Sequence, residues 1–281
     1  MSEPDAAPAG SAPASSNLVM RVLAALVLAP LALVLAYAGG WLWALLVTLA
    51  SIGLFAEWLT VVGAAGSVVL TASGTAVLAI MGFCVAFGAL KTAVITGLVG
   101  GAIVTLLARG MLVWAATGFA YASAALLASI LVRQDPVNGF AALMFVLLVV
   151  WATDIGGYFA GRGIGGPKLW PRVSPKKTWA GAFGSFAASL GVAGGFAACG
   201  IGKAIPLLLV SAVLTVVSQL GDLFESAVKR RFGVKDSSHL IPGHGGLLDR
   251  LDGFVAAILV AWIIGFLRHG VHSAGSGLMV W

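Results

Sequence analysis

Charged side chains are scarce in this chain of 281 residues. Asp, Glu, Lys and Arg make up only 9% of the residues, whereas 60% are hydrophobic and the mean hydropathy is +1.06. A soluble domain does not expose so much apolar surface, so a soluble enzyme and a soluble nucleic-acid-binding domain are both excluded. Apolar runs long enough to cross the hydrocarbon core, which takes roughly 20 residues, follow one another almost end to end. The sequence therefore predicts an all-α fold, a polytopic bundle of transmembrane helices in a lipid bilayer.

Cysteine is scarcer still, and an internal repeat is missing. Cys84 and Cys199 both lie inside apolar runs. Two isolated cysteines give neither a metal-ligand spacing nor a disulfide framework, so we expect both to be buried filler. A transporter for an anionic solute, the alternative outside the enzymes, would carry charges along a path across the membrane and often an inverted repeat. The sequence has neither feature.

Nine apolar runs are candidate membrane spans. Residues 1–17, which are rich in Ala, Pro and Ser, precede them and are predicted to be a disordered tail. The expected spans are 18–38, 41–62, 67–90, 92–108, 111–132, 138–160, 178–199, 204–223 and 253–267. We divide the chain into N-terminal transmembrane helices, residues 18–150, and a catalytic membrane domain, residues 151–281.

The basic residues predict the orientation in the membrane. Two spans separate the loop at 161–177 from the loop at 229–250, so both loops face the same side. Together they hold 10 of the 16 Lys and Arg residues, and the positive-inside rule makes their side cytoplasmic. The N-terminus is then cytoplasmic and the C-terminus lies outside. Arg133 and Asp135 fall on the outer side, against this trend.

Charges of both signs are concentrated in two windows. Residues 151–177 and 222–252 contain 16 of the 26 charged residues. Charge close to a membrane is costly, so such a mixed cluster marks a functional site more often than a topology signal. We expect one polar active site at the cytoplasmic face of the bundle.

Four carboxylates flank the second window. Asp222 and Glu225 stand at i and i+3 near the end of one span, so they share a helical face. Asp249 and Asp252 repeat this spacing at the start of the next span. We expect all four to bind a hard cation such as Mg²⁺, which takes oxygen ligands from carboxylates and substrate phosphates. The alternative is that each acid pairs with a neighbouring base, for example Asp222 with Lys229.

The bases complement these acids. Residues 161–168 read GRGIGGPK, and residues 174–178, SPKKT, lead directly into a helix. Glycines let backbone amides approach a phosphate, and a helix N-terminus adds partial positive charge. An ordinary basic loop is the alternative. The predicted substrate-binding residues here are Arg162, Lys168, Ser174, Lys176, Lys177 and Thr178.

The second window supplies further candidates. Its PGHGG turn, residues 242–246, brings backbone close to any bound phosphate, and we assign His244 a positioning role. Asp154 is a candidate further ligand, and Glu57, in an early span, has no partner visible in the sequence. The predicted catalytic residues are Asp222, Lys229, Arg230, His244, Asp249, Arg250 and Asp252, and Lys235, Gly245 and Gly246 are predicted to bind substrate.

The second window also carries a resemblance to a known family. Residues 226–252 read SAVKRRFGVKDSSHLIPGHGGLLDRLD, which is similar to the signature of CDP-diacylglycerol synthases, the phosphatidate cytidylyltransferases. Residues 161–178 and 218–226 resemble two further blocks of that family. The resemblance covers the C-terminal half, whereas residues 1–150 match only as generic spans. One position departs from the pattern, because Ala180 stands where the family usually carries Glu.

The resemblance implies a reaction in which CTP and phosphatidate give CDP-diacylglycerol and diphosphate. It also implies a requirement for Mg²⁺, with a second cation as an option, and a homodimer, most simply in a bacterial inner membrane. The charged residues suit this reaction, because transfer between two anions depends mainly on positioning and on charge neutralisation. A lipid-alcohol kinase that uses CTP is the alternative enzyme, with His244 as its base, but the long signature argues against it.

Overall fold

Almost the whole chain is helical. The computed structural model describes residues 14–238 and 245–281, with side chains from residue 26 onward. Within these ranges eight helices are long and apolar enough to cross a membrane, and Leu26–Ala38 adds a shorter apolar segment. The predicted all-α polytopic fold is therefore confirmed. The helices are α1 (Ala14–Ala38), α2 (Gly40–Val61), α3 (Val68–Ala86), α4 (Leu90–Leu107), α5 (Leu112–Gln134), α6 (Gly139–Gly163), α7 (Trp179–Ala198), α8 (Ala204–Arg231), α9 (Leu248–His269), the 3-10 turn η1 (Val271–Ser273) and α10 (Ala274–Met279).

The helices differ from the expected spans at their polar ends. Residues 14–17, expected to belong to the tail, are the start of α1, and the rest of the predicted tail, residues 1–13, lies outside the described residues. α8 continues to Arg231 and α9 begins at Leu248, so most charges expected in a loop lie on helices. The end of α8 stays helical because Glu225 and Lys229 form an i,i+4 ion pair and Val228 packs into the core.

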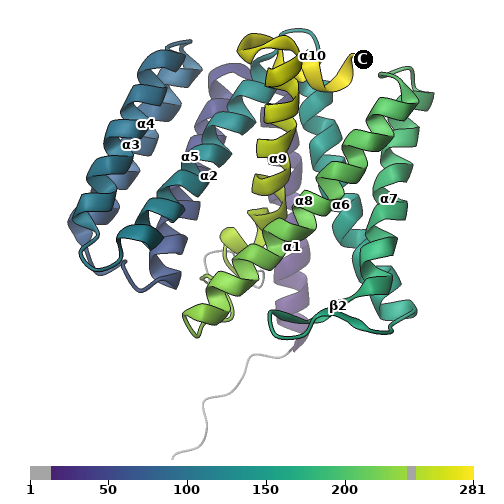
Figure 1. The fold of residues 1–281 in the computed structure, drawn as a ribbon, viewed down its shortest axis with the longest axis horizontal. Helices are drawn as coiled ribbons and strands as arrows, with labels where there is room; N and C mark the ends of the chain where they lie inside the picture. Colours follow the sequence, from purple (N-terminus) through teal and green to yellow (C-terminus); the bar gives the residue numbers. More distant parts are fainter. Residues whose placement is uncertain (1–13, 239–244) are drawn as a thin grey trace, which may run out of the picture.

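The helices run between two ends of the bundle (Figure 1). α3 and α4 form one flank, α6 and α7 form the opposite flank, and α8 slants across the front of α9. A short hairpin of β1 (Lys168–Trp170) and β2 (Ser174–Thr178), which the sequence did not predict, lies at the end opposite α10 and the C-terminus. The predicted orientation, with the basic loops on one side of the membrane and the C-terminus on the other, requires that they lie at opposite ends of the bundle.

The surface and the core match a membrane environment. One buried hydrophobic cluster includes side chains from Ala36 to Met279 and so joins both predicted segments. Large apolar side chains such as Phe83 and Leu98 point outward, as expected where helices face lipid. The prediction that both cysteines are buried is wrong for Cys199, which is exposed just after the end of α7, while Cys84 is half-buried.

Small residues and hydroxyls hold α6, α7 and α8 together around the polar end. A side chain at Gly181 of α7 would meet the carbonyl of Gly157 of α6 at 2.9 Å, so these two helices can pack only through glycine. The Ser185 hydroxyl donates to the Thr153 carbonyl at 2.7 Å. The Thr215 hydroxyl of α8 donates to Ser189 at 2.6 Å. These contacts fix three helices that surround the site.

Arg133 and Asp135, the two charges that go against the predicted orientation, have structural roles. Arg133 donates to the carbonyls of Ala36 and Tyr37 and so ties α5 to the end of α1. Asp135 accepts from the Ser276 amide at 2.6 Å and so ties α5 to α10. Their position against the charge trend follows from these contacts.

Candidate active site

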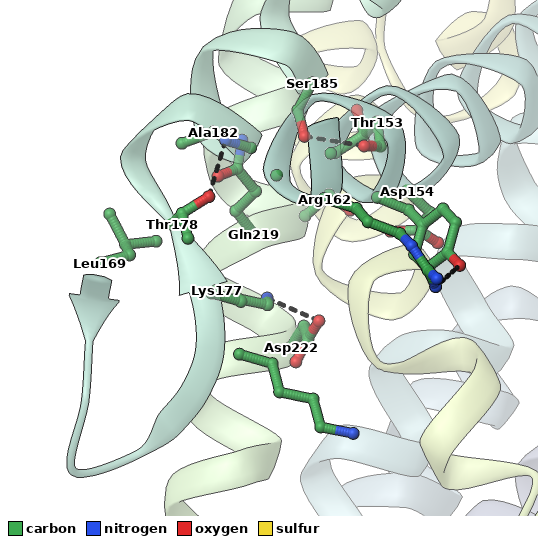
Figure 2. A pocket seen from close by; sticks show the side chains of 16 residues that line it. Thr153, Asp154, Arg162, Leu169, Lys177, Thr178, Ala182, Ser185, Gln219 and Asp222 are labelled. Atoms are coloured by element: carbon green, nitrogen blue, oxygen red, sulfur yellow. Dashed lines mark hydrogen bonds and ion pairs between the residues drawn. The ribbon is translucent and has the colours of Figure 1, made fainter. Parts of the chain in front are cut away.

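A cavity of about 460 Å³ opens at the hairpin end of the bundle. It lies between α6, the hairpin, α7 and α8, and Figure 2 shows Lys177 and Asp222 pointing toward one another across it. Arg162 and Asp154 of α6 line its other side. Both charge signs therefore meet in one cavity at the hairpin end of the bundle.

The hairpin positions the cations of this cavity. Gly165 and Gly166 have φ of +69° and +89°, a left-handed conformation that suits glycine and turns the chain out of α6. Lys168 then pairs with Thr178 in the antiparallel hairpin. The Thr178 side chain accepts from the Gly181 amide at 3.1 Å and caps α7. Lys177 thus stands directly before a helix N-terminus, where anions are favoured.

Asp222 has a different partner from the one the sequence suggested. Its carboxylate lies 2.6 Å from Lys177 Nζ, with 33% and 27% of the two side chains exposed. The predicted alternative of pairing with Lys229 is wrong, although the general idea of acid–base pairing holds. An ion pair this accessible contributes only about 0–1 kcal/mol to stability.

Two further carboxylates, those of Asp154 and Asp252, lie near this pair. Asp154, Asp222 and Asp252 interact electrostatically with one another. Asp252 reaches this position because α8 and α9 pack closely, since a side chain at Gly221 would meet the Asp252 carbonyl at 2.7 Å. We call Asp154, Lys177, Asp222 and Asp252 the cavity cluster.

A second set of charges lies at the end of the same helices. Lys229 Nζ is 2.7 Å from Glu225 and 2.5 Å from Asp249, and only 11%, 2% and 11% of the three side chains are exposed. Asp249 also accepts from the amides of Ser237 and Gly246. We call Glu225, Lys229, Ser237 and Asp249 the Lys229 cluster. One carboxylate oxygen of Glu225, Oε1, has no hydrogen-bond partner among the described residues.

Glu57 of α2 adjoins the Lys229 cluster and is 5% exposed. Its Oε1 accepts from the Ser238 hydroxyl and the Leu247 amide, and its Oε2 accepts from the Ser237 hydroxyl and the Leu248 amide, all at 2.7–2.8 Å. The sequence signal was present, because a buried acid in a span is rarely without a role. Its partners could not be found from sequence, since they lie 180 to 191 residues away.

The residues predicted from sequence differ in where the structure places them. Arg162, Lys176, Lys177, Thr178 and Asp222 line the cavity. Lys168, Ser174, Arg230 and Lys235 do not line it in the described part of the chain, and the Arg230 guanidinium bonds the Val234 carbonyl instead. Arg250 lies near the cavity cluster and interacts electrostatically with Asp154. His244 lies outside the described residues.

Gly245 and Gly246, which were predicted to bind substrate, have conformational and packing roles in the structure. Gly245 has φ of +88°, which favours glycine. A side chain at Gly246 would collide with the Ser237 hydroxyl and with the Glu57 carboxylate. Ala180 stands in the first turn of α7, beside the lining residues Gly181 and Ala182. Lining residues that the sequence analysis missed include Tyr158, which accepts from Arg162 at 2.9 Å, and Gln219.

The carboxylates can be tested for their fit to a divalent cation. No three His, Cys, Asp or Glu side chains in the described ranges are already close enough to hold a metal ion. Mg²⁺ needs only one or two carboxylates when substrate phosphates supply further oxygens. The oxygen donors of the cavity cluster, their mutual repulsion and the unpartnered Glu225 Oε1 all fit such an ion.

Comparison with known proteins decides the family. Residues 19–267 match the model of the Cytidylyltransferase family. This chain belongs to that family. A phosphatidate cytidylyltransferase of Brucella suis is 41% identical over 273 residues, which is 92% of this chain and 98% of the relative. Phosphatidate cytidylyltransferases of Haemophilus influenzae and Bacillus subtilis are 45% and 43% identical over 131 and 127 residues, or 44% of this chain in each case.

Membership of the cytidylyltransferase family confirms the resemblance noted in the signature. It extends that resemblance beyond the C-terminal half, because the Brucella suis relative aligns with nearly the whole chain. The N-terminal helices therefore belong to the family fold and are more than generic spans. Glu57 lies within this extended match.

Proposed function

We propose that this chain is a phosphatidate cytidylyltransferase that converts CTP and phosphatidate into CDP-diacylglycerol and diphosphate. The observation that carries the proposal is the similarity to a relative of that name along 92% of the chain. The cavity supports it independently, because cations and carboxylates face each other there at the end of a membrane bundle. Such a site suits two anionic substrates, one of them a lipid.

In this reaction the phosphate monoester of phosphatidate attacks the α-phosphorus of CTP. A P–O bond forms between them, the P–O bond to the β-phosphate breaks, and diphosphate leaves with its electron pair. The nucleophile is already an anion, so the protein needs little general-base help and must mainly neutralise charge and align the reactants. Lys177, Lys176 and Arg162 are the cavity cations available for this. The N-terminus of α7 favours an anion at the same place.

We propose Mg²⁺ as the cofactor, held by Asp222 and Asp252 with Asp154 as a further donor. When bound, the ion would offset charge on the reacting phosphates and on the departing diphosphate. Glu225 and Asp249 remain predicted ligands. Asp249 would first have to give up its contact with Lys229, whereas Glu225 contacts Lys229 through Oε2 and has no hydrogen-bond partner for Oε1 among the described residues. Lys177 is held by Asp222 and becomes available to a substrate phosphate once a cation takes that carboxylate. A second cation is part of the same proposal.

The position of the cavity suits the lipid substrate. The acyl chains of phosphatidate can stay in hydrocarbon beside the apolar helices while its phosphate enters at the polar end. We place this end at the cytoplasmic face of a bacterial inner membrane, because the basic windows gather there. A homodimer is also proposed, and crosslinking in native membranes would test it.

The deciding experiment measures lipid-soluble label formed from phosphatidate and α-labelled CTP by the purified protein in detergent with Mg²⁺. We expect labelled CDP-diacylglycerol, and we expect it to vanish with EDTA. Transfer of label from γ-labelled CTP to a lipid alcohol would instead support the kinase. Absence of both products from folded protein would overturn the proposed function.

A further inference from the structure

Helix α9 carries Asp249 and Asp252 but has no cap of its own. Its N-cap position is Leu247, whose side chain cannot accept a hydrogen bond, and no side-chain cap is formed there. The first amides of a helix need acceptors when they are buried. Glu57 supplies them from another helix, because its two carboxylate oxygens accept from the Leu247 and Leu248 amides at 2.8 Å each. A carboxylate at a helix N-terminus is also favoured by the helix dipole.

The same carboxylate holds the chain on the other side of the signature turn. Glu57 accepts from the Ser237 and Ser238 hydroxyls at 2.8 and 2.7 Å. It therefore bonds residues on both sides of the stretch 239–244. Each oxygen takes two donors, one from each side, so the carboxylate fixes the distance between residues 237–238 and the start of α9.

The contact continues from Glu57 to the acids of the site. The Ser237 hydroxyl lies 2.8 Å from Glu57 and 3.1 Å from Asp249, so the two carboxylates share one donor. Asp249 in turn pairs with Lys229. Close packing supports the arrangement, because side chains at Gly53 of α2 and at Gly246 would collide with Leu247 and with Glu57 itself. Close packing thus limits how the start of α9 lies against α2.

From this geometry we propose that Glu57 is a positioning residue of the active site. It sets where α9 begins and how it is rotated, and through α9 it aims Asp252 into the cavity cluster and Asp249 at Lys229. Among the described residues Glu57 makes no hydrogen bond to a residue that lines the cavity, so it acts through α9 and through Ser237. The inference rests on the proposed function for its catalytic consequence, but the positioning itself can be measured without turnover.

The test compares Glu57→Gln, Glu57→Asp and wild-type protein. Glutamine keeps one acceptor oxygen and puts an amide where two donors now point, whereas aspartate keeps the charge on a shorter side chain. We expect faster hydrogen–deuterium exchange in the first turn of α9 for Glu57→Gln and unchanged exchange in α7. We also expect kcat to fall about 10- to 100-fold, as is common when distant residues misplace a site. The Mg²⁺ concentration for half-maximal activity should rise several-fold while KM for CTP changes less. Glu57→Asp should recover part of both losses.

Thr48→Val is the matched control, since Thr48 is buried on α2 but bonds only the Ala44 carbonyl of its own helix among the described contacts. We expect wild-type exchange in α9 and wild-type Mg²⁺ dependence for this variant. Unchanged exchange at the start of α9 in Glu57→Gln would overturn the inference whatever the activity. Faster exchange with unaltered kcat and Mg²⁺ dependence per folded protein would reduce Glu57 to a purely structural residue and also overturn it. If the wild type makes no CDP-diacylglycerol, the proposed function fails, and the exchange measurement alone then decides whether Glu57 positions α9.

Discussion

The cavity cluster and the Lys229 cluster both take carboxylates from α8 and α9 but are built differently. The sequence suggested that Asp222 and Glu225, and likewise Asp249 and Asp252, would act together because each pair shares a helical face. The structure instead divides each pair between the clusters. Asp222 lines the cavity and interacts electrostatically with Asp252, whereas Glu225 and Asp249 hold Lys229 one turn further along.

The clusters differ in how their charged side chains are paired and in how far these side chains are exposed to solvent. In the Lys229 cluster one cation serves two buried carboxylates, and backbone amides complete Asp249. In the cavity cluster the Lys177 ammonium pairs with Asp222 and attracts Asp154, whereas Asp252 interacts electrostatically with these two carboxylates. About a third of the Asp222 side chain is exposed. Buried charges that pair with one another hold a shape, whereas accessible charges are free to bind ligands. Neighbouring positions of one signature can therefore have opposite tasks.

The largest effect should come from replacing the lysine of each cluster by methionine, in two separate variants. Lys229→Met leaves two buried carboxylates without their cation, so we expect the free energy of unfolding to fall by about 3–5 kcal/mol. Lys177→Met breaks an accessible pair, which contributes only about 0–1 kcal/mol, so its stability should stay close to wild type while turnover drops. Thermal unfolding in detergent beside the CTP assay measures both. Equal destabilisation by the two variants would contradict the proposed difference between the Lys229 cluster and the cavity cluster.

The next effect separates the two aspartates by their metal dependence. Asp222→Asn should reduce kcat about 100-fold and raise the Mg²⁺ concentration for half-maximal activity, because it removes a proposed ligand charge. Asp249→Asn should lower the melting temperature and leave the Mg²⁺ dependence of the remaining activity unchanged. A Mg²⁺ titration of both variants checks this. A shifted Mg²⁺ requirement in Asp249→Asn would show that the earlier prediction of Asp249 as a metal ligand is right.

These predictions depend on contacts that sequence reasoning reached only in part. The membrane fold, the basic windows and the signature acids were predictable, because span length, charge and motif spacing are local properties. The partner of Asp222 was not, since Lys177 lies on a hairpin that the sequence did not reveal. The partners of Glu57 were hidden for a similar reason, because they depend on how α2 packs against the start of α9.

A smaller effect is expected at Gly246. Its Ala variant must push against Ser237 and Glu57, so we expect a loss of about 1–3 kcal/mol and slower turnover. Gly191→Ala in α7 is the control, because a side chain there meets nothing within 4 Å. Melting temperatures of the two variants provide the comparison. A Gly246→Ala protein as stable as the control would mean that the signature turn is loosely held.

The smallest effect is expected at Asp135, a hydrogen-bonded carboxylate at the opposite end of the bundle from the cavity. Burial raises the pKa of Asp135, but hydrogen bonds from Asn138, Ser276 and Val137 outweigh it and hold the pKa below its usual value. A lowered folded pKa stabilises the protein above the unfolded pKa of about 3.9, and this contribution is lost as the pH falls through the folded value. We expect the melting temperature of wild type to drop more steeply below pH 4 than that of Asp135→Asn. Parallel curves for the two proteins would contradict this.

The hydrogen bonds of Glu57 also order events during synthesis. Its amide partners in α9 are made 190 and 191 residues later. At a synthesis rate of about 5–20 residues per second, this carboxylate waits on the order of 10–40 s for its partners. During that time the Glu57 carboxylate on α2 lacks the amides that donate hydrogen bonds to it in the folded protein. The carboxylate must therefore stay near water or be sheltered by the insertion machinery. The early helices can therefore reach their final packing only after the ribosome has delivered the last long helix.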